Sequence, residues 1–221
     1  MHKIRVSWQI VQKAPDPLWT IVAIGDSTTA GTPGFKSPLE APPDGAGNVE
    51  SQYAHWLGVI HGGWRVLNRG INGERSDEIR ARFDRDVLQA SPDLVVVIAG
   101  VNDIYQGRTA DAVERELEGI YAAAHAAAIP VVAGSILPYN TASADENRRM
   151  HDLNRWIREY ASRHAGVSFC DTRAAVAAPE SPDRLGSSPD GLHPSPDGYK
   201  RMALALEPVV AAVLANPHPL R

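Results

Sequence analysis

A serine after a short apolar run is the first residue of this sequence that could do chemistry. Ser27 follows the run Ile21 to Ile24 and the pair Gly25-Asp26, and small residues come after it, so the chain can turn sharply and expose the hydroxyl. A serine in such a place also commonly caps a helix or bonds within a turn. A hydroxyl becomes a good nucleophile only beside a base, so a catalytic role requires a histidine and a group that orients it.

The segment Asp190-Gly191-Leu192-His193-Pro194 contains both groups. Asp190 and His193 stand three positions apart in an expected loop, so the carboxylate can reach Nδ1 and leave Nε2 for Ser27. The alternatives are a turn or a pair of metal ligands. No other histidine stands at a companion spacing and no HExxH motif occurs, so the pattern favours a Ser27-His193-Asp190 triad and predicts no metal.

Acyl transfer by a serine also needs hydrogen-bond donors for the negative oxygen that develops in the transition state. Gly70 and Asn102 fit that need, because a glycine lets its N–H approach a substrate closely and an asparagine amide donates without adding charge. Each also has a simpler explanation, as a turn residue or a capping group. The conjunction of all these residues is what favours serine acyl transfer.

The elements expected around these residues alternate between strand and helix. Apolar spacings of three and four predict helices around Val113 to Ala124 and Met150 to Tyr160. Nearly continuous apolar runs, typical of strands covered on both faces, occur at 21–24, 64–67, 94–98, 131–136 and 167–170. The alternation predicts an α/β fold with a parallel sheet and helices on both faces. Ligands bind beyond the carboxyl ends of such strands, where three of the candidate residues follow a run.

The composition predicts one domain over residues 1–221, with an additional strand within residues 1–18, where Ile4, Val6, Trp8 and Ile10 alternate with polar residues. A formal charge of -4 and the lack of a basic run favour a small-molecule partner over nucleic acid. No apolar stretch is long enough for a membrane span and no signal-peptide pattern is seen, so we expect a cytoplasmic protein without membrane insertion. The lone Cys170 excludes an internal disulfide and is expected to be buried.

Four ordered blocks, GDSTTAG, NRGINGERS, AGVND and DGLHPS, resemble those of the SGNH (GDSL-type) hydrolase family over residues 21 to 198. The resemblance implies a three-layer α/β/α, flavodoxin-like fold and cofactor-free ester hydrolysis. It also implies that Ser27 is the nucleophile and first oxyanion donor, that Gly70 and Asn102 are further donors, and that His193 is the base oriented by Asp190. Thr28 stands where the family signature has leucine, and Asp26 is expected to shape the turn.

Other readings have less support. The sequence lacks the motifs of a nucleotide-binding α/β domain, since it has no Gly-Lys dipeptide and no GxGxxG after a strand. An inactive binding module of the same fold would be expected to have lost a triad residue, and none is missing. The polar loops 32–48 and 171–189 are expected to border Ser27 and to favour acetyl to butyryl esters. Carbohydrate acetylesterase and lysophospholipase or thioesterase activities are the alternatives within the family, and the oligomeric state is left open.

Overall fold

Five parallel strands form the centre of the structure, a computed structural model that describes residues 19–216. Their spatial order is β4-β1-β5-β6-β7, which is the flavodoxin-like order 2-1-3-4-5. The strands are β1 (Trp19–Gly25), β4 (Trp64–Gly70), β5 (Leu94–Ile98), β6 (Val131–Gly134) and β7 (Val167–Cys170). All five apolar runs are strands, as predicted, and β6 ends two residues earlier than its run. The additional strand expected within residues 1–18 lies outside the described residues.

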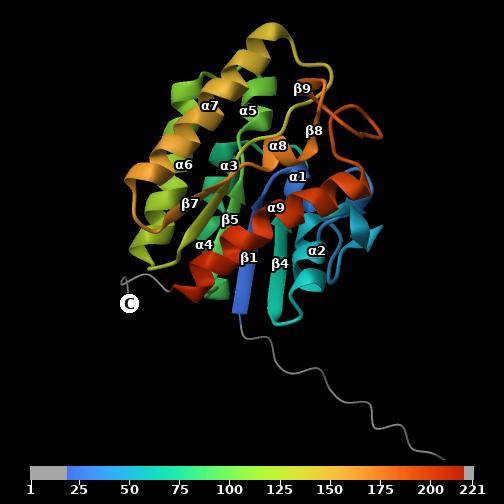
Figure 1. The fold of residues 1–221 in the computed structure, drawn as a ribbon. Coiled ribbons are helices and arrows are strands. Elements are labelled where there is room, and N and C mark those ends of the chain that lie inside the picture. Colours follow the sequence, from blue (N-terminus) through green and yellow to red (C-terminus); the bar gives the residue numbers. More distant parts are fainter. Residues whose placement is uncertain (1–18, 217–221) are drawn as a thin grey trace, which may run out of the picture.

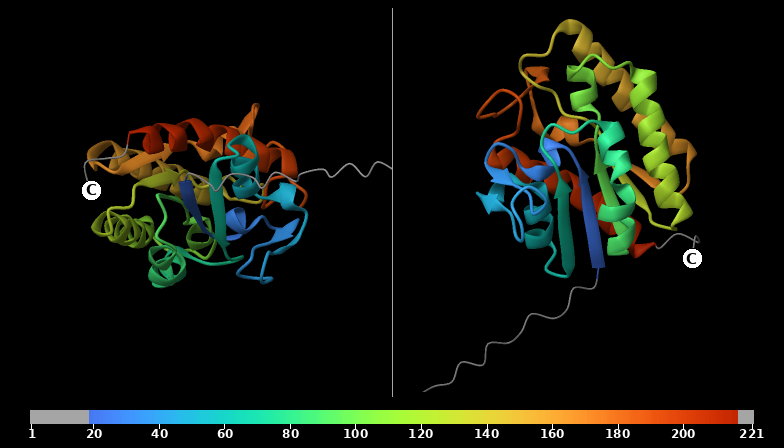
Figure 2. Two further views of the ribbon diagram at one scale, coloured as in Figure 1. Left: turned by 90° about the horizontal axis from the view of Figure 1, so that it is seen from below. Right: turned by 180° about the vertical axis from the view of Figure 1, so that it is seen from behind.

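Helices cover both faces of this sheet, which gives the three layers seen from below in Figure 2 and confirms the predicted α/β/α class. One layer contains α3 (Ser76–Ala81), α4 (Phe83–Asp86), α5 (Val101–Tyr105), α6 (Ala110–Ala126) and α7 (Ala144–Arg163). The other contains α2 (Tyr53–Ile60), α8 (Thr172–Val176) and α9 (Pro196–Ala215), the last crossing the sheet in Figure 1. The remaining elements are short. Two small hairpins pair β2 (Phe35–Lys36) with β3 (Ala46–Gly47) and β8 (Ala177–Ala178) with β9 (Ser181–Leu185). The helix α1 (Ser27–Ala30) has one turn, and short 3-10 turns occur at Val49–Ser51 and Leu88–Ala90.

The strand β1 shows why the central runs are apolar throughout. Successive side chains of a strand point to opposite faces. Val22 and Ile24 accordingly pack into the core beneath α3 to α7, whereas Ile21 and Ala23 pack into the core beneath α2 and α9. All four side chains are fully buried. A polar residue at any of these positions would therefore face a helix layer and not water, so the sequence shows no alternation.

The topology places the candidate chemistry at one edge of the sheet. β1 lies between β4 and β5, and the chain leaves these parallel strands at the same end. The connections to α1, α3 and α5 therefore begin side by side. A crevice forms at such a point because the connection from β1 runs to the layer of α2, whereas the connection from its neighbour β5 runs to the layer of α5.

Candidate active site

Ser27 is the first residue of α1, one residue beyond the cap Asp26. The Asp26 carboxylate accepts the N–H of Thr28 at 2.9 Å, and its carbonyl accepts the N–H of Ala30, so Asp26 shapes the turn as expected. Gly25 is required before it, because a Cβ there would lie 2.3 Å from the carbonyl oxygen of Ile98. Complete burial raises the pKa of Asp26 to about 7, despite the hydrogen bonds that it accepts from Thr28.

The three predicted triad residues are brought together. Ser27 Oγ lies 2.9 Å from Nε2 of His193, and Nδ1 of His193 lies 2.7 Å from Oδ2 of Asp190. An ionised carboxylate only accepts hydrogen bonds, so the ring proton belongs on Nδ1 and Nε2 is left to accept the serine hydroxyl. This is the arrangement in which a histidine can remove the serine proton.

The loop before α9 holds the aspartate and the histidine as one unit. Asp190 Oδ1 accepts the N–H groups of Leu192 and His193, and the Ser188 hydroxyl donates to the carbonyl of His193 at 2.6 Å. Partial burial alone would raise the pKa of Asp190, but the hydrogen bonds from the His193 ring and from these two N–H groups hold it below its usual value. Asp190 therefore stays ionised at neutral pH.

Two of the three predicted oxyanion donors are free to act. The N–H of Ser27 has no hydrogen-bond partner within residues 19–216, and it belongs to the nucleophile itself. Asn102 lies in the first turn of α5 and lines the same cavity as Ser27. One N–H of its amide donates to the carbonyl of Glu74 at 2.9 Å, which orients the group and leaves the second N–H available.

The structure does not support the predicted role of Gly70 as the third donor. Its N–H already donates to Oδ1 of Asn68 at 2.9 Å, and Gly70 is not among the residues that line the cavity. A Cβ at this position would lie 2.1 Å from the backbone nitrogen of Ala30. Gly70 therefore allows β4 and α1 to approach each other closely, and it offers a substrate no hydrogen bond.

The connection from β4 to α3 nevertheless holds one free donor, the N–H of Gly73. Gly73 has the left-handed φ of +82°, and nothing lies within 4 Å of a Cβ built on it. Each of the other N–H groups of residues 70–76 has an acceptor: Asn68 Oδ1, Gly25 O, Glu40 Oε1, Ile71 O, Glu78 Oε2 and Asp103 Oδ2. Within residues 70–76, only the N–H of Gly73 has no partner among the described residues. Asn72 lines the cavity and Glu74 contacts Asn102, so Gly73 stands between two residues of the site.

Arg82 is a second residue that sequence reasoning missed. It is 6% exposed, and its Nη2 donates to the carbonyl of Gly25 at 2.9 Å, before the nucleophile turn. Its Nε donates to the carboxylate of Glu74 at 2.6 Å, and its Nη1 reaches the carbonyl of Arg69 and the carboxylate of Asp86. One guanidinium thus joins the strand ends behind Ser27 and the loop that carries Gly73.

A cavity of about 160 Å³ lies beside Ser27 and His193. Its remaining walls come from five places: α1, the loop after β4, α5, the segment after β6, and the loop before α9. They are Thr28, Asn72, Val101, Asn102, Tyr105, Leu137, Pro138, Tyr139 and Leu192. No residue of the loops 32–48 and 171–189 lines it, contrary to expectation. The loop 32–48 instead contacts the connection after β4, because Glu40 accepts the N–H of Asn72 and Ser37 donates to the carbonyl of Gly70.

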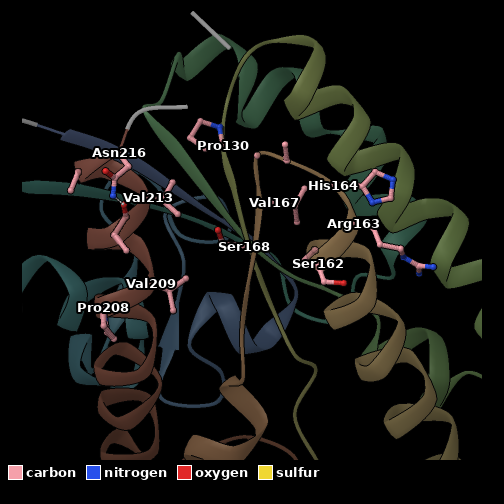
Figure 3. Close-up of a pocket in the computed structure, with 15 residues that line it drawn as sticks. Pro130, Ser162, Arg163, His164, Val167, Ser168, Pro208, Val209, Val213 and Asn216 are labelled. Carbon is pink, nitrogen blue, oxygen red and sulfur yellow. Dashed lines mark hydrogen bonds between the residues drawn. The ribbon is translucent and has the colours of Figure 1, made fainter. Parts of the chain in front are cut away.

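A much larger hollow is an open groove of about 1140 Å³, shown in Figure 3. It lies beside the edge strand β7, between the ends of α7 and α9, and has no serine-histidine pair within hydrogen-bond distance. No three His, Cys, Asp or Glu side chains of residues 19–216 are grouped so that they could hold a metal. Within the same residues no helix has the length and apolar character of a membrane span. Cys170 is buried, as predicted, and burial raises the pKa of its thiol to about 12.

The α/β/α sheet and a serine-histidine-aspartate chain at the carboxyl end of its strands define a serine hydrolase of the flavodoxin-like type. Residues 23–201 match the model of the GDSL-like Lipase/Acylhydrolase family, and the chain belongs to this family. It is a carboxylic ester hydrolase. The predicted family resemblance is thereby confirmed.

Relatives of known sequence or structure agree with this placement. An acetylxylan esterase from Geobacillus stearothermophilus is 27% identical over 177 residues, which cover 70% of this chain and 76% of that protein. A GDSL-like lipase from Bacteroides thetaiotaomicron has a TM-score of 0.71 at 23% identity and covers 88% of each chain. A catalytic mutant of an acetylxylan esterase from Geobacillus stearothermophilus has a TM-score of 0.68 at 22% identity, with 88% of this chain and 94% of that chain covered.

Proposed function

We propose that this protein hydrolyses esters of short acyl groups, acetyl to butyryl, through an acyl-enzyme at Ser27. Ser27 Oγ attacks the ester carbonyl carbon while His193 Nε2 takes the hydroxyl proton. Asp190 holds the ring in the required tautomer and stabilises the imidazolium that forms. The tetrahedral intermediate collapses when the imidazolium gives its proton to the departing alcohol oxygen, and the acyl group stays on Ser27. Water then repeats the two proton transfers and releases the acid.

Three donors are available for the oxyanion of both intermediates: the N–H groups of Ser27 and Gly73 and the amide of Asn102. Gly73 takes the place of Gly70 in this set, because the N–H of Gly70 already donates to Asn68 Oδ1. Donors that are fixed before the reaction stabilise the developing charge without reorganising, and each contributes about 10²- to 10³-fold in kcat. Arg82 and Glu74 are expected to keep the Gly73 loop in place, since they join it to the end of β1.

The observation that carries the short-acyl proposal is the size of the cavity beside Ser27. Pockets for drug-sized ligands measure about 300–1,000 Å³, and an apolar cavity of about 150 Å³ holds one benzene molecule. A cavity of about 160 Å³ therefore receives roughly six non-hydrogen atoms. No deeper channel is offered by α5, because Ile104 is fully buried in the core and Val101 lines the cavity itself.

A carbohydrate acetylester is the second candidate substrate. It is favoured by the relative at 27% identity, which is an acetylxylan esterase. An acetyl group would occupy the small cavity, and the sugar would remain in solvent beside the exposed Leu192 and the loop of the base. Lysophospholipase activity is less well supported, because the cavity offers a long acyl chain little buried apolar surface.

Hydrolysis of p-nitrophenyl esters from C2 to C12, below micelle-forming concentrations, tests the acyl range. We expect the highest kcat/KM between C2 and C4, and a maximum at C8 or longer would refute the short-acyl proposal. Acetylated xylo-oligosaccharides, compared with p-nitrophenyl acetate, test the second candidate. A fluorophosphonate should label Ser27, and the Ser27→Ala variant should stay folded and lose both labelling and turnover. Labelling of another serine would contradict the assignment of the nucleophile.

A further inference from the structure

Two tyrosines meet at the wall of the cavity beside Ser27. Tyr105 is the last residue of α5 and Tyr139 lies in the segment after β6, and both line the cavity. Their ring centroids are 5.8 Å apart with an angle of 75° between the planes, an edge-to-face contact. Tyr139 is 3% exposed, whereas Tyr105 is 61% exposed. One ring is therefore fixed in the protein, and the other covers it from the solvent side.

This contact borders the acyl side of the cavity. The departing alcohol oxygen must face His193 Nε2, because it takes its proton from there, and Leu192 lies beside that residue in the loop of the base. The acyl carbonyl oxygen must face Asn102. Tyr105 stands three residues after Asn102 on the same helix, so the two side chains share a face of α5. Leu137 and Pro138, which precede Tyr139 in the chain, also line the cavity.

We propose that the contact between Tyr105 and Tyr139 closes the acyl side of the cavity and sets the upper limit of acyl-chain length. This inference rests on the proposed function, and it names the side chains that make the acyl range short. A chain longer than butyryl would have to separate the two rings or leave the cavity. Removing the exposed ring would extend the apolar wall of Leu137, Pro138 and Tyr139 toward solvent. Burial of one methylene corresponds to about fourfold in kcat/KM, which is the gain expected for each carbon that the opened cavity receives.

The test compares acyl-chain profiles, kcat/KM for p-nitrophenyl esters from C2 to C12, between wild type and variants at Tyr105. Tyr105→Ala should raise the C6 to C2 ratio of kcat/KM by about tenfold or more, whereas Tyr105→Phe and Tyr105→Trp keep a ring in place and should retain the wild-type profile. Tyr105 is 61% exposed and its ring contacts the buried Tyr139, so these substitutions should leave the protein folded. Leu204→Ala is the matched control, because Leu204 is also a large exposed apolar side chain, 53% exposed, and does not line the cavity.

Each outcome has a separate meaning. A Tyr105→Ala profile parallel to that of the wild type, or an equal loss of activity for all chain lengths, would overturn the proposal for the tyrosine pair. A shift in Tyr105→Phe as large as that in Tyr105→Ala would also overturn it, because the ring would then not be the barrier. A wild-type optimum at C8 or longer would instead refute the short-acyl function, whatever the variants do.

Discussion

Asn68 Oδ1 accepts the N–H of Gly70 at 2.9 Å, and this hydrogen bond decides which glycine of the NRGINGERS block can serve a substrate. The amide nitrogen of Asn68 donates to Oε1 of Gln52 at 2.7 Å and to the carbonyl of Ala30, so the buried Asn68 uses both ends of its side chain within the protein. Asn68 thus joins the end of β4 to the nucleophile turn. Gly70 belongs to this support, whereas the N–H of Gly73 is free and is the proposed oxyanion donor.

The two glycines should therefore respond differently to alanine. Gly70→Ala places a Cβ against the backbone of Ala30 and should lower the melting temperature strongly. Gly73→Ala meets no atom within 4 Å, but alanine is strained at a φ of +82°, so the turn should relax and displace its N–H. We expect about a tenfold to hundredfold lower kcat in Gly73→Ala with a nearly unchanged melting temperature. Wild-type kcat in Gly73→Ala would exclude this N–H as a donor.

Asn102→Ala should lower kcat and leave KM almost unchanged. The amide is expected to donate to the oxyanion and not to the ground-state ester, so its loss costs about 10²- to 10³-fold, or ~3–4 kcal/mol, in the transition state. Steady-state kinetics with p-nitrophenyl acetate measure the effect. Asn72→Ala is the matched control, because Asn72 lines the same cavity and its known hydrogen bond comes from the main chain. A larger loss of kcat in Asn72→Ala would transfer the role to that amide.

Arg82→Met should destabilise the protein by about 3–5 kcal/mol, since it leaves the buried carboxylate of Asp86 and the carbonyl of Gly25 without this partner. Arg82→Lys should recover only part of the loss, because one ammonium cannot reach four acceptors. Arg85→Met is the control: Arg85 binds the same Asp86, but its side chain is 62% exposed, so a change below about 1 kcal/mol is expected. Urea unfolding measures all three variants, and equal effects of Arg82→Met and Arg85→Met would contradict the prediction.

Asp26 should make stability depend on pH. Its pKa is raised by burial from 3.8 to about 7, so between these values the unfolded chain has lost a proton that the folded protein keeps. The contribution of Asp26 to the free energy of unfolding therefore falls as pH rises, by at most about 1.4 kcal/mol per pH unit, and is constant above the folded pKa. Asp26→Asn cannot ionise and keeps an acceptor for the N–H of Thr28. Urea titrations measure the free energy of unfolding at each pH. The difference between Asp26→Asn and wild type should change in favour of the variant from pH 4 to pH 7. A difference that is independent of pH would refute the raised pKa.

Much of this architecture could be predicted from the sequence, because its signals are local. Five apolar runs gave five strands. The inner strands β1, β5 and β6 are buried on both faces and carry no polar residue in their centres, whereas the edge strands β4 and β7 contain Arg65 and Ser168. Ser27, Asp190 and His193 could be found for a related reason. A reactive side chain has few chemical substitutes, so its residue type is itself a signal. Ser27 stands at a strand exit, and Asp190 and His193 stand in the loop before a helix, so their positions are also recognisable.

The remaining features depend on contacts that spacing does not encode. Gly70 and Gly73 stand in the same block, and only the contact of Asn68 with Gly70 separates them. Arg82 reads as one of several charged residues on helical segments, although its guanidinium is buried against the end of β1. The loops 32–48 and 171–189 lie close to the triad in sequence, yet the segment after β6 supplies the cavity wall, because the strand order brings it beside α5.

The serine and the histidine that share a hydrogen bond are 166 residues apart in the chain. A nascent polypeptide that has emerged from the ribosome only as far as β9 holds the proposed nucleophile and the proposed oxyanion donors, but not the proposed base His193. The hydroxyl of Tyr199 in α9 donates to the carbonyl of Thr32, just after the turn that carries Ser27. Docking of α9 therefore also brings the loop that carries His193 beside Ser27. The onset of esterase activity during refolding therefore times the docking of α9, and during translation it marks a polypeptide that has extended beyond β9.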